Sequence, residues 1–324
     1  MLPNFSYVRA KSVTEVVRAL AAPGARLHAG GTDLLGCLRD GVVKADKVVS
    51  LSGVAALRGI TKPAAGGLRI GALTTLAEVA ANKEVVERYP ALAQAALAVG
   101  SPQLRNQGTI GGNVCQRPRC WYFRGDFNCL RKGGDTCYAM QGENQYHAIF
   151  GGSACYMVHP SDTAVALVAL GARARIAGPG GTRTLPFSTF FVLPAKTVTA
   201  ETVLARGEVL TDILLPASDG ATKSSFRKVR SRGAWDFALA SVALAVSLDA
   251  AGTVKQAHVV LGAAAPAPWR AADAEKSLVG NKLTADLAAR AAEAAVKGAE
   301  TLSQNGYKVP LFRGLVEEQL LAMA

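Results

Sequence analysis

The feature that most constrains this fold is a cysteine-rich stretch in the middle of the chain. The segment NVCQRPRCWYFRGDFNCLRKGGDTC, residues 113–137, holds four of the six cysteines and follows directly on the glycine-rich run TIGG. Cys120, Cys129, Cys137 and Cys155 are irregularly spaced, without the close Cys-x-x-Cys pairs of most structural zinc sites. Irregular spacing with intervening glycines is typical of a loop wrapped around a larger object.

The sequence leaves three uses open for these four thiols. A four-iron cluster needs four thiolates spread around it and does not dictate one spacing, so a 4Fe-4S cluster is the first interpretation. Zinc binding and unligated thiols are the alternatives. A disulfide framework is not expected in a chain of this size without a signal segment. We interpret Cys37 and Cys115 as small buried hydrophobic residues.

Two glycine turns are candidate phosphate-binding loops. The first, HAGGTDLL, follows a strand-like segment, and the second, TIGGN, comes about 80 residues later. Glycines let backbone N–H groups approach a phosphate without an intervening Cβ, so the two loops could hold the two phosphates of one dinucleotide. Two unrelated turns would explain the same residues. Neither loop is a GxGxxG or Walker sequence, so a Rossmann or P-loop site is not supported.

The remaining sequence predicts an α+β protein in several lobes. Strand-like runs and helices do not alternate regularly, which argues against a doubly wound sheet. Ser12 with Glu15 and Thr75 with Glu78 have the spacing of capping boxes that open helices. Small and polar residues cluster in PASDGATKSS, residues 216–225, and predict a domain boundary there.

Composition restricts the partners and the compartment. The net charge is +12, but the Lys and Arg residues are dispersed with few interleaved aromatics, so nucleic acid is not an expected partner. No apolar run is long enough for a membrane span, and the N-terminus lacks the apolar region of a secretory signal. We expect a cytoplasmic chain, or a periplasmic one that is exported together with a signal-bearing partner.

Four segments together carry a family resemblance. AGGTDLL, SPQLRNQGTIGGNVCQRPRC, HPSDTAVAL and FRKVRSRGAWDFALASVA resemble the FAD-binding medium subunit of the xanthine dehydrogenase family of molybdenum hydroxylases. The cysteine insert is similar to that of the aldehyde oxidoreductases of the bacterial periplasmic type, and secondly to that of 4-hydroxybenzoyl-CoA reductase. In both, the insert carries a 4Fe-4S cluster.

The resemblance implies an α+β fold of the vanillyl-alcohol oxidase and MurB type. A two-lobed FAD-binding domain would span residues 1–220, with lobes at about 1–56 and 57–220 and a 4Fe-4S insert at 114–156. A small sheet-and-helix domain would follow at residues 221–324, resembling the C-terminal domain of the carbon monoxide dehydrogenase flavoprotein.

The resemblance also implies a set of cofactor contacts. Two loops would face the FAD pyrophosphate, an acid would contact the flavin nucleotide, an apolar residue would pack on it, and a basic residue would lie near the ring. In that order, these residues are Ala29, Gly30, Gly31, Thr32, Asp33 and Leu34, then Thr109, Ile110, Gly111, Gly112 and Asn113, then Asp162, Leu210 and Lys228. The implied cluster ligands are Cys120, Cys129, Cys137 and Cys155.

The resemblance finally implies a function. The chain would be the FAD and 4Fe-4S subunit of a heterotrimeric molybdenum-dependent aldehyde oxidoreductase, passing electrons to an external acceptor. A large subunit would hold the molybdenum cofactor and a small subunit the 2Fe-2S clusters. The alternatives are a subunit of the 4-hydroxybenzoyl-CoA reductase kind with reversed electron flow, and a non-catalytic assembly subunit that binds zinc.

Overall fold

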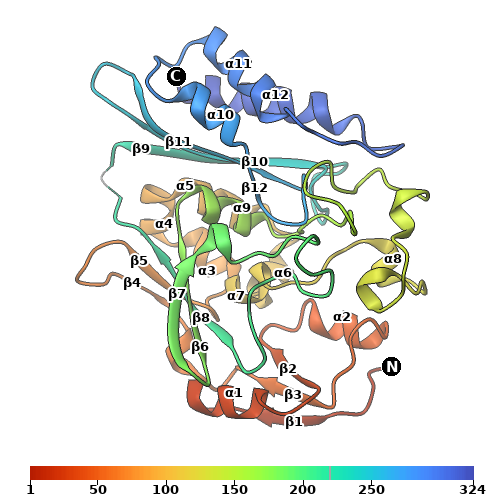
Figure 1. Cartoon of the computed structure of the whole chain (residues 1–324). Helices are drawn as coiled ribbons and strands as arrows, with labels where there is room; N and C mark the ends of the chain where they lie inside the picture. Colours follow the sequence, from red (N-terminus) through yellow and green to blue (C-terminus); the bar gives the residue numbers. More distant parts are fainter. Residues whose placement is uncertain (219) are drawn as a thin grey trace.

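Three sheets organise the molecule. The computed structural model describes residues 1–218 and 220–324. A three-stranded sheet lies at one end, a five-stranded sheet in the middle, and a four-stranded sheet under the last helices (Figure 1). The predicted α+β architecture, two lobes followed by a sheet-and-helix domain, is confirmed. The strands come from residues 6–50, 60–215 and 222–270, while the domain bounds at 56 and 220 stay predictions.

The first sheet is parallel and begins the first lobe. Its strands are, in spatial order, β1 (Ser6–Arg9), β3 (Lys47–Ser50) and β2 (Ala25–His28). The connecting helices are α1 (Val13–Leu20) and α2 (Leu34–Arg39). Ser12 caps α1 by accepting from the Glu15 amide, but the Glu15 carboxylate accepts from Lys11 instead of Ser12. The predicted reciprocal capping box is therefore only half formed here.

The second sheet is antiparallel and joins distant parts of the chain. Its spatial order is β4 (Ile60–Thr61), β5 (Leu68–Gly71), β8 (Val209–Leu215), β6 (Arg173–Gly178) and β7 (Gly181–Pro186). The helices between β5 and β6 are α3 (Leu76–Ala81), α4 (Lys83–Arg88), α5 (Pro90–Leu97), α6 (Pro102–Gln107), α7 (Ile110–Val114), α8 (Trp121–Arg124) and α9 (Asp162–Ala169). Thr75 and Glu78 form the complete capping box predicted for α3.

The third sheet is buried on both faces. Its antiparallel strands are β12 (Trp269–Arg270), β11 (Val254–Gly262), β10 (Ala240–Leu248) and β9 (Thr222–Val229). One face is covered by α10 (Ala272–Leu278), α11 (Ala285–Ala295) and α12 (Lys308–Leu321), and the other packs on α5 and α9. Burial on both sides explains why β10 reads ASVALAVSL without a polar alternation.

The cysteine-rich segment lies along one side of these layers (Figure 1). Between α7 and α9 it contains the short helix α8 and two 3₁₀ turns, Leu130–Lys132 and Tyr138–Met140. The irregular loop expected from the cysteine spacing is what the chain forms. No helix in residues 1–218 or 220–324 is long and apolar enough to cross a bilayer.

Candidate cofactor cleft and cysteine cavity

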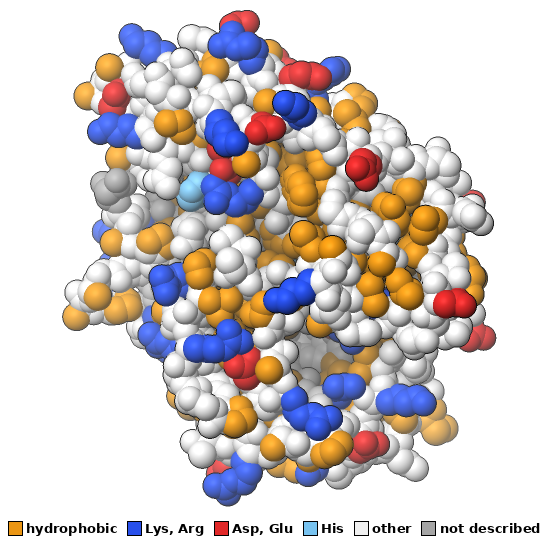
Figure 2. Space-filling view, viewed as in Figure 1, with side chains coloured by type: hydrophobic (Ala, Val, Ile, Leu, Met, Phe, Trp, Pro, Cys, Tyr) orange, Lys and Arg blue, Asp and Glu red, His pale blue; other side chains and the backbone are white. Residues whose placement is uncertain are grey.

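A cleft of about 820 Å³ opens where elements of all three sheets meet. Its walls come from the β2–α2 loop, the α6–α7 loop, the start of α9, strand β8 and the β9–β10 loop. Figure 2 shows this side of the molecule hollowed below its middle, with basic side chains around the hollow. The predicted residues that line the cleft are Ala29, Gly30, Gly31, Thr32, Asp33, Leu34, Thr109, Gly111, Gly112, Asn113, Asp162 and Leu210.

Two predicted contact residues do not line this cleft. The Ile110 side chain is fully buried in the core of the second lobe. Lys228 stands behind the wall, where its Nζ lies 2.7 Å from the Asp162 carboxylate and both side chains are buried. Burial raises the pKa of Asp162, and the Lys228 ammonium opposes that rise. Lys228 therefore reaches the cleft only through Asp162.

The two glycine loops lie against each other. An atom placed at the Cβ position of Gly30 would sit 2.0 Å from the Gln107 carbonyl oxygen, just before the second loop. The Gln107 side chain in turn donates to the Gly30 carbonyl at 3.1 Å. Because a carbonyl in a packed turn cannot retreat, only glycine allows this approach. The two loops therefore form one continuous wall.

The loops differ in the donors they offer. In the second loop, the Gly111 amide donates to Ala72 and the Gly112 amide donates to the Thr109 hydroxyl. In the first loop, by contrast, the amides of Gly30, Gly31 and Thr32 have no acceptor within the part of the chain that is described. Free backbone donors along a cleft suit an anion such as a pyrophosphate.

Asn113 supplies a further donor at the second loop. Its Oδ1 accepts from the hydroxyls of Ser161 and Thr163, each at 2.6 Å. These bonds fix the amide plane and leave the Nδ2 donor for a ligand. The second loop therefore offers a side-chain donor where backbone donors were expected.

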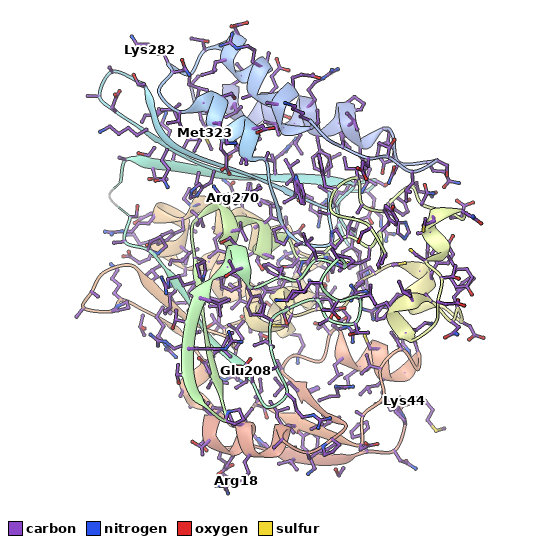
Figure 3. All side chains as sticks on the ribbon, in the orientation of Figure 1. Arg18, Lys44, Glu208, Arg270, Lys282 and Met323 are labelled. Carbon is purple, nitrogen blue, oxygen red and sulfur yellow. The ribbon has the colours of Figure 1, made fainter. Side chains whose placement is uncertain are left out.

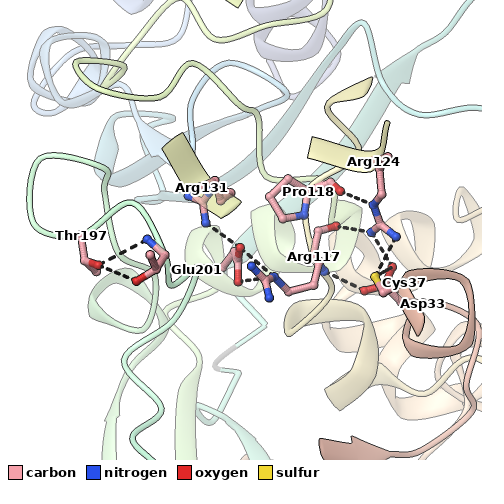
Figure 4. A network of polar contacts seen from close by, with 9 residues as sticks. Asp33, Cys37, Arg117, Pro118, Arg124, Arg131, Thr197 and Glu201 are labelled. Atoms are coloured by element: carbon pink, nitrogen blue, oxygen red, sulfur yellow. Dashed lines mark hydrogen bonds and ion pairs between the residues drawn. The ribbon is translucent and has the colours of Figure 1, made fainter. Parts of the chain in front are cut away.

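An ion-pair network joins the first loop to the cysteine-rich segment. Asp33 makes no cap for α2; its carboxylate accepts from the Arg117 amide at 2.8 Å, from Arg124 at 2.7 Å and from Arg119 at 2.9 Å. The Arg117 side chain continues to Glu201, which also binds the buried Arg131 at 2.6 Å (Figure 4). The cleft and the cysteine-rich segment are thus one connected structure.

The four predicted ligands line a single small cavity. Cys120, Cys129, Cys137 and Cys155 are free thiols around a space of about 20 Å³, whereas Cys37 and Cys115 lie in the cleft. Such a volume holds about one water molecule. No three His, Cys, Asp or Glu side chains are placed to hold one metal ion within residues 1–218 and 220–324. The irons of a cluster take one thiolate each, so its ligands lie farther apart than those of one ion.

The thiols of the cavity differ in acidity. A hydrogen bond between Cys137 and Cys155 raises the pKa of Cys137 and lowers that of Cys155 to about 6, with help from Arg131. Burial raises the pKa of Cys120 to about 11 and that of Cys115 to about 12. Arg131 favours a thiolate at Cys155, while the neutral thiol is favoured at Cys115. Cys37 is buried as expected, whereas Cys115 is only half-buried at the cleft wall.

Sequence reasoning missed several residues of the cleft. Arg26 on β2 and Arg206 line the cleft, and Arg206 lies in the loop before β8 that also carries Glu208, which Figure 3 labels. Trp235 and Phe237 reach it from the β9–β10 loop, and the Arg119 guanidinium lies 5.1 Å from the Phe237 ring centroid. The Trp235 backbone has a φ of 52° and its amide donates to Gly100. No periodic signal marks such loop residues.

Comparisons with known proteins agree with this geometry. Residues 3–218 match the family described as the FAD binding domain in molybdopterin dehydrogenase, and residues 224–323 match the carbon monoxide dehydrogenase flavoprotein C-terminal domain. The FAD-binding subunit PaoB of an Escherichia coli aldehyde oxidoreductase is 40% identical over 84% of this chain and 86% of its own. A glyceraldehyde dehydrogenase medium chain from Sulfolobus acidocaldarius is 30% identical over 88% and 84%.

Solved structures show the same fold. Carbon monoxide dehydrogenase from Hydrogenophaga pseudoflava superimposes with a TM-score of 0.78 at 27% identity, covering 98% of this chain and 96% of its own. Quinoline 2-oxidoreductase from Pseudomonas putida 86 gives 0.78 at 27% identity, covering 99% and 97%. The fold and the matched domains are those of FAD-binding subunits of oxidoreductases. Within this class, the chain belongs to the FAD-binding medium subunits of the molybdenum hydroxylase family.

Proposed function

We propose that this chain is the FAD and 4Fe-4S electron-transfer subunit of a heterotrimeric, molybdenum-dependent aldehyde oxidoreductase. The observation that carries the proposal is the convergence of Cys120, Cys129, Cys137 and Cys155 on one cavity, tied by Asp33 and Glu201 to the cleft of an FAD-binding family. The aldehyde specificity is supported by the names of the PaoB relative and the glyceraldehyde dehydrogenase chain.

The residues of the cleft fit FAD. The free amides of Gly30, Gly31 and Thr32 would bind the pyrophosphate, with the Asn113 amide opposite them. Asp162 and Leu210 line the cleft on the side of β8 and α9, as a ring-binding wall requires. Bound FAD would supply a carrier that exchanges single electrons with clusters and electron pairs with an acceptor.

The cysteine cavity offers the four thiol ligands that a 4Fe-4S cluster needs, but its volume is too small for the cluster. Four thiols match the ligand requirement, and Arg131 offsets negative charge on their sulfurs. A cubane is larger than a cavity of about 20 Å³, so binding has to move the loops around the four cysteines apart. Within the described residues those loops have no sheet pairing beyond one isolated bridge between Cys129 and Thr136, and they are held by side-chain contacts such as the Arg131–Glu201 ion pair.

The substrate would be oxidised on another chain. We propose a large subunit with the molybdenum cofactor, a small subunit with 2Fe-2S clusters, and an external acceptor that receives the electrons. The same cofactors would serve the reversed electron flow of a 4-hydroxybenzoyl-CoA reductase, but the aldehyde-named relatives favour oxidation.

Reconstitution tests the proposal. The purified single chain should bind flavin and iron yet reduce no dye with an aldehyde, and dye reduction should appear when the large and small subunits are added. Aldehyde oxidation by the single chain at the rate of the complex would contradict the proposal. A colourless chain that binds only zinc would favour the assembly-subunit alternative.

A further inference from the structure

A second cavity, of about 330 Å³, lies between the cleft and the cysteine cavity. We call it the bridging cavity because its wall is shared with both neighbours. The residues shared with the cleft are Arg119, Pro160, Asp162, Asp236 and Phe237, and those shared with the cysteine cavity are Cys120 and His147. An occupant would therefore contact the walls of both proposed redox centres.

Aromatic faces dominate the open side of the bridging cavity. Trp121 and Tyr146 stand with their ring centroids 5.6 Å apart, and Phe237 enters from the β9–β10 loop. All three are between 39% and 46% exposed, so parts of their ring surfaces are accessible to a ligand. Because Trp121 and Tyr146 contact each other at an interplanar angle of 54°, a flat ligand would stack against one of these rings and not between them.

The polar groups of the wall select for acceptor atoms on that ligand. Arg119 and Arg232 contribute guanidinium groups, of which only some N–H donors are used, by Asp33 and Gln116 for Arg119 and by the Trp235 carbonyl for Arg232. The Asp162 carboxylate is paired with Lys228, whereas the Asp236 carboxylate in the same wall accepts from the Phe237 amide. The unused N–H donors of the two guanidinium groups can bind carbonyl oxygens of a ligand.

Buried groups close the inner end of the cavity. His147 is 4% exposed and its Nε2 lies 3.2 Å from the Cys120 sulfur. His159, Ser161 and Ser241 are buried in the same wall. The inner end is therefore lined by buried side chains and reaches Cys120, one of the proposed cluster ligands.

We propose that the bridging cavity binds a small planar conjugated molecule with carbonyl oxygens, of the quinone class, as electron acceptor. This inference rests on the proposed function, which leaves the acceptor open. Oxidation of an aldehyde and water to a carboxylic acid releases two electrons and two protons. A quinone takes up two electrons and two protons as its carbonyl oxygens become hydroxyls, so the two half-reactions balance.

Calorimetric titration with 2-methyl-1,4-naphthoquinone tests the inference on oxidised protein without aldehyde. Tyr146→Ala removes a wall that neither neighbouring cavity uses and should weaken binding about tenfold, as the loss of a stacking partner does. Tyr7→Ala changes another exposed tyrosine, which lies on β1 outside all three cavities, and should leave binding unchanged. Arg232→Met is the second variant and should weaken binding as well.

Repeating the titration with FAD bound and after FAD removal shows whether the quinone has a site of its own. Equal quinone affinity with FAD bound and after FAD removal supports a distinct site. Binding that occurs only after FAD removal, and that FAD displaces, would overturn the inference because the cavity would then be part of the FAD cleft. Flavin-containing protein that binds no quinone, or binds it equally well as Tyr146→Ala, also overturns it. Absence of flavin from the same preparation contradicts the proposed function instead.

Discussion

Gly30 is the residue that most directly holds the two glycine loops together. Its missing side chain admits the Gln107 carbonyl, and a methyl group there would overlap that oxygen. Gly30→Ala should therefore separate the loops and weaken FAD binding at least tenfold. Fluorescence titration of the flavin-free protein measures this.

Gly36→Ala is the matched control. Gly36 lies in α2 six residues further on, and nothing stands within 4 Å of its Cβ position. FAD affinity should stay at the wild-type value in this variant. Equal flavin affinity in Gly30→Ala would show that the loops tolerate separation.

The ion pair of Asp162 and Lys228 gives a second prediction at this scale. Lys228→Met leaves a carboxylate buried without its partner, which costs about 3–5 kcal/mol of unfolding free energy. Combining it with Asp162→Asn should recover much of that loss, because the second change removes the uncompensated charge. Urea unfolding of both variants measures the difference, and equal destabilisation would contradict the account.

At the residue scale, the sequence indicates which residues share a cavity where the chemistry is local, while their contacts with cofactors stay predictions. Glycines beside Thr and Asp indicated the cleft loops, and irregular cysteine spacing indicated the four residues that share a cavity. The sequence could not indicate that Ile110 turns inward or that Lys228 stands behind Asp162, because both depend on packing between distant elements. Trp235 and Phe237 were missed for the same reason: they reach the cleft from the third sheet.

At the scale of elements, the tether between α2 and the cysteine-rich segment is the feature to test. Asp33→Asn keeps the shape but loses the charge that binds Arg119 and Arg124. We expect a loss of about 2 kcal/mol in unfolding free energy, as for hydrogen bonds to charged groups. We also expect faster proteolysis within residues 115–160, because the segment loses its anchor.

Asp40→Asn is the control for this variant. Asp40 pairs with Arg39 at the other end of α2, where both side chains are exposed. Exposed pairs contribute little, so unfolding and proteolysis should match the wild type. If Asp33→Asn and Asp40→Asn unfolded and were cleaved alike, the ion pairs of Asp33 would not anchor the cysteine-rich segment.

Elements were predictable where hydrophobic pattern and caps agree. The strands β5, β6, β8, β10 and β11 coincide with the apolar runs of the sequence, and Thr75 opens α3 as its spacing indicates. Strand order was not readable, since β5 pairs with β8 across the whole insert. The glycine loops, the cysteine segment and the third sheet meet only because of that long-range pairing.

At the scale of the whole molecule, Lys308 links three parts of the fold. Its buried Nζ donates to the carbonyls of Tyr146 and Ala263, so α12, the cysteine-rich segment and the end of β11 are joined. Burial lowers the pKa of Lys308 from 10.5 to about 7. Stability should therefore depend on pH through this one group.

The direction of this pH dependence follows from the number of protons that Lys308 binds in the folded and unfolded states. Between about pH 7 and 10.5 the unfolded chain holds a proton that folded Lys308 has lost, so raising the pH favours the folded state. The unfolding free energy of the wild type relative to Lys308→Met should rise by up to about 1.4 kcal/mol per pH unit in this range. Denaturant unfolding measures it, with the exposed Lys276→Met as control. A difference independent of pH would contradict the assignment.

The central claim, that this flavin-binding chain also holds a four-iron cluster, is tested most directly by cofactor content. Iron, sulfide and flavin are assayed in anaerobically purified wild-type protein and in Cys129→Ser and Cys115→Ser. We predict about four irons and one FAD per chain, with the iron lost in Cys129→Ser and kept in Cys115→Ser. Full flavin with zinc or no metal, or iron lost only in Cys115→Ser, would contradict the account.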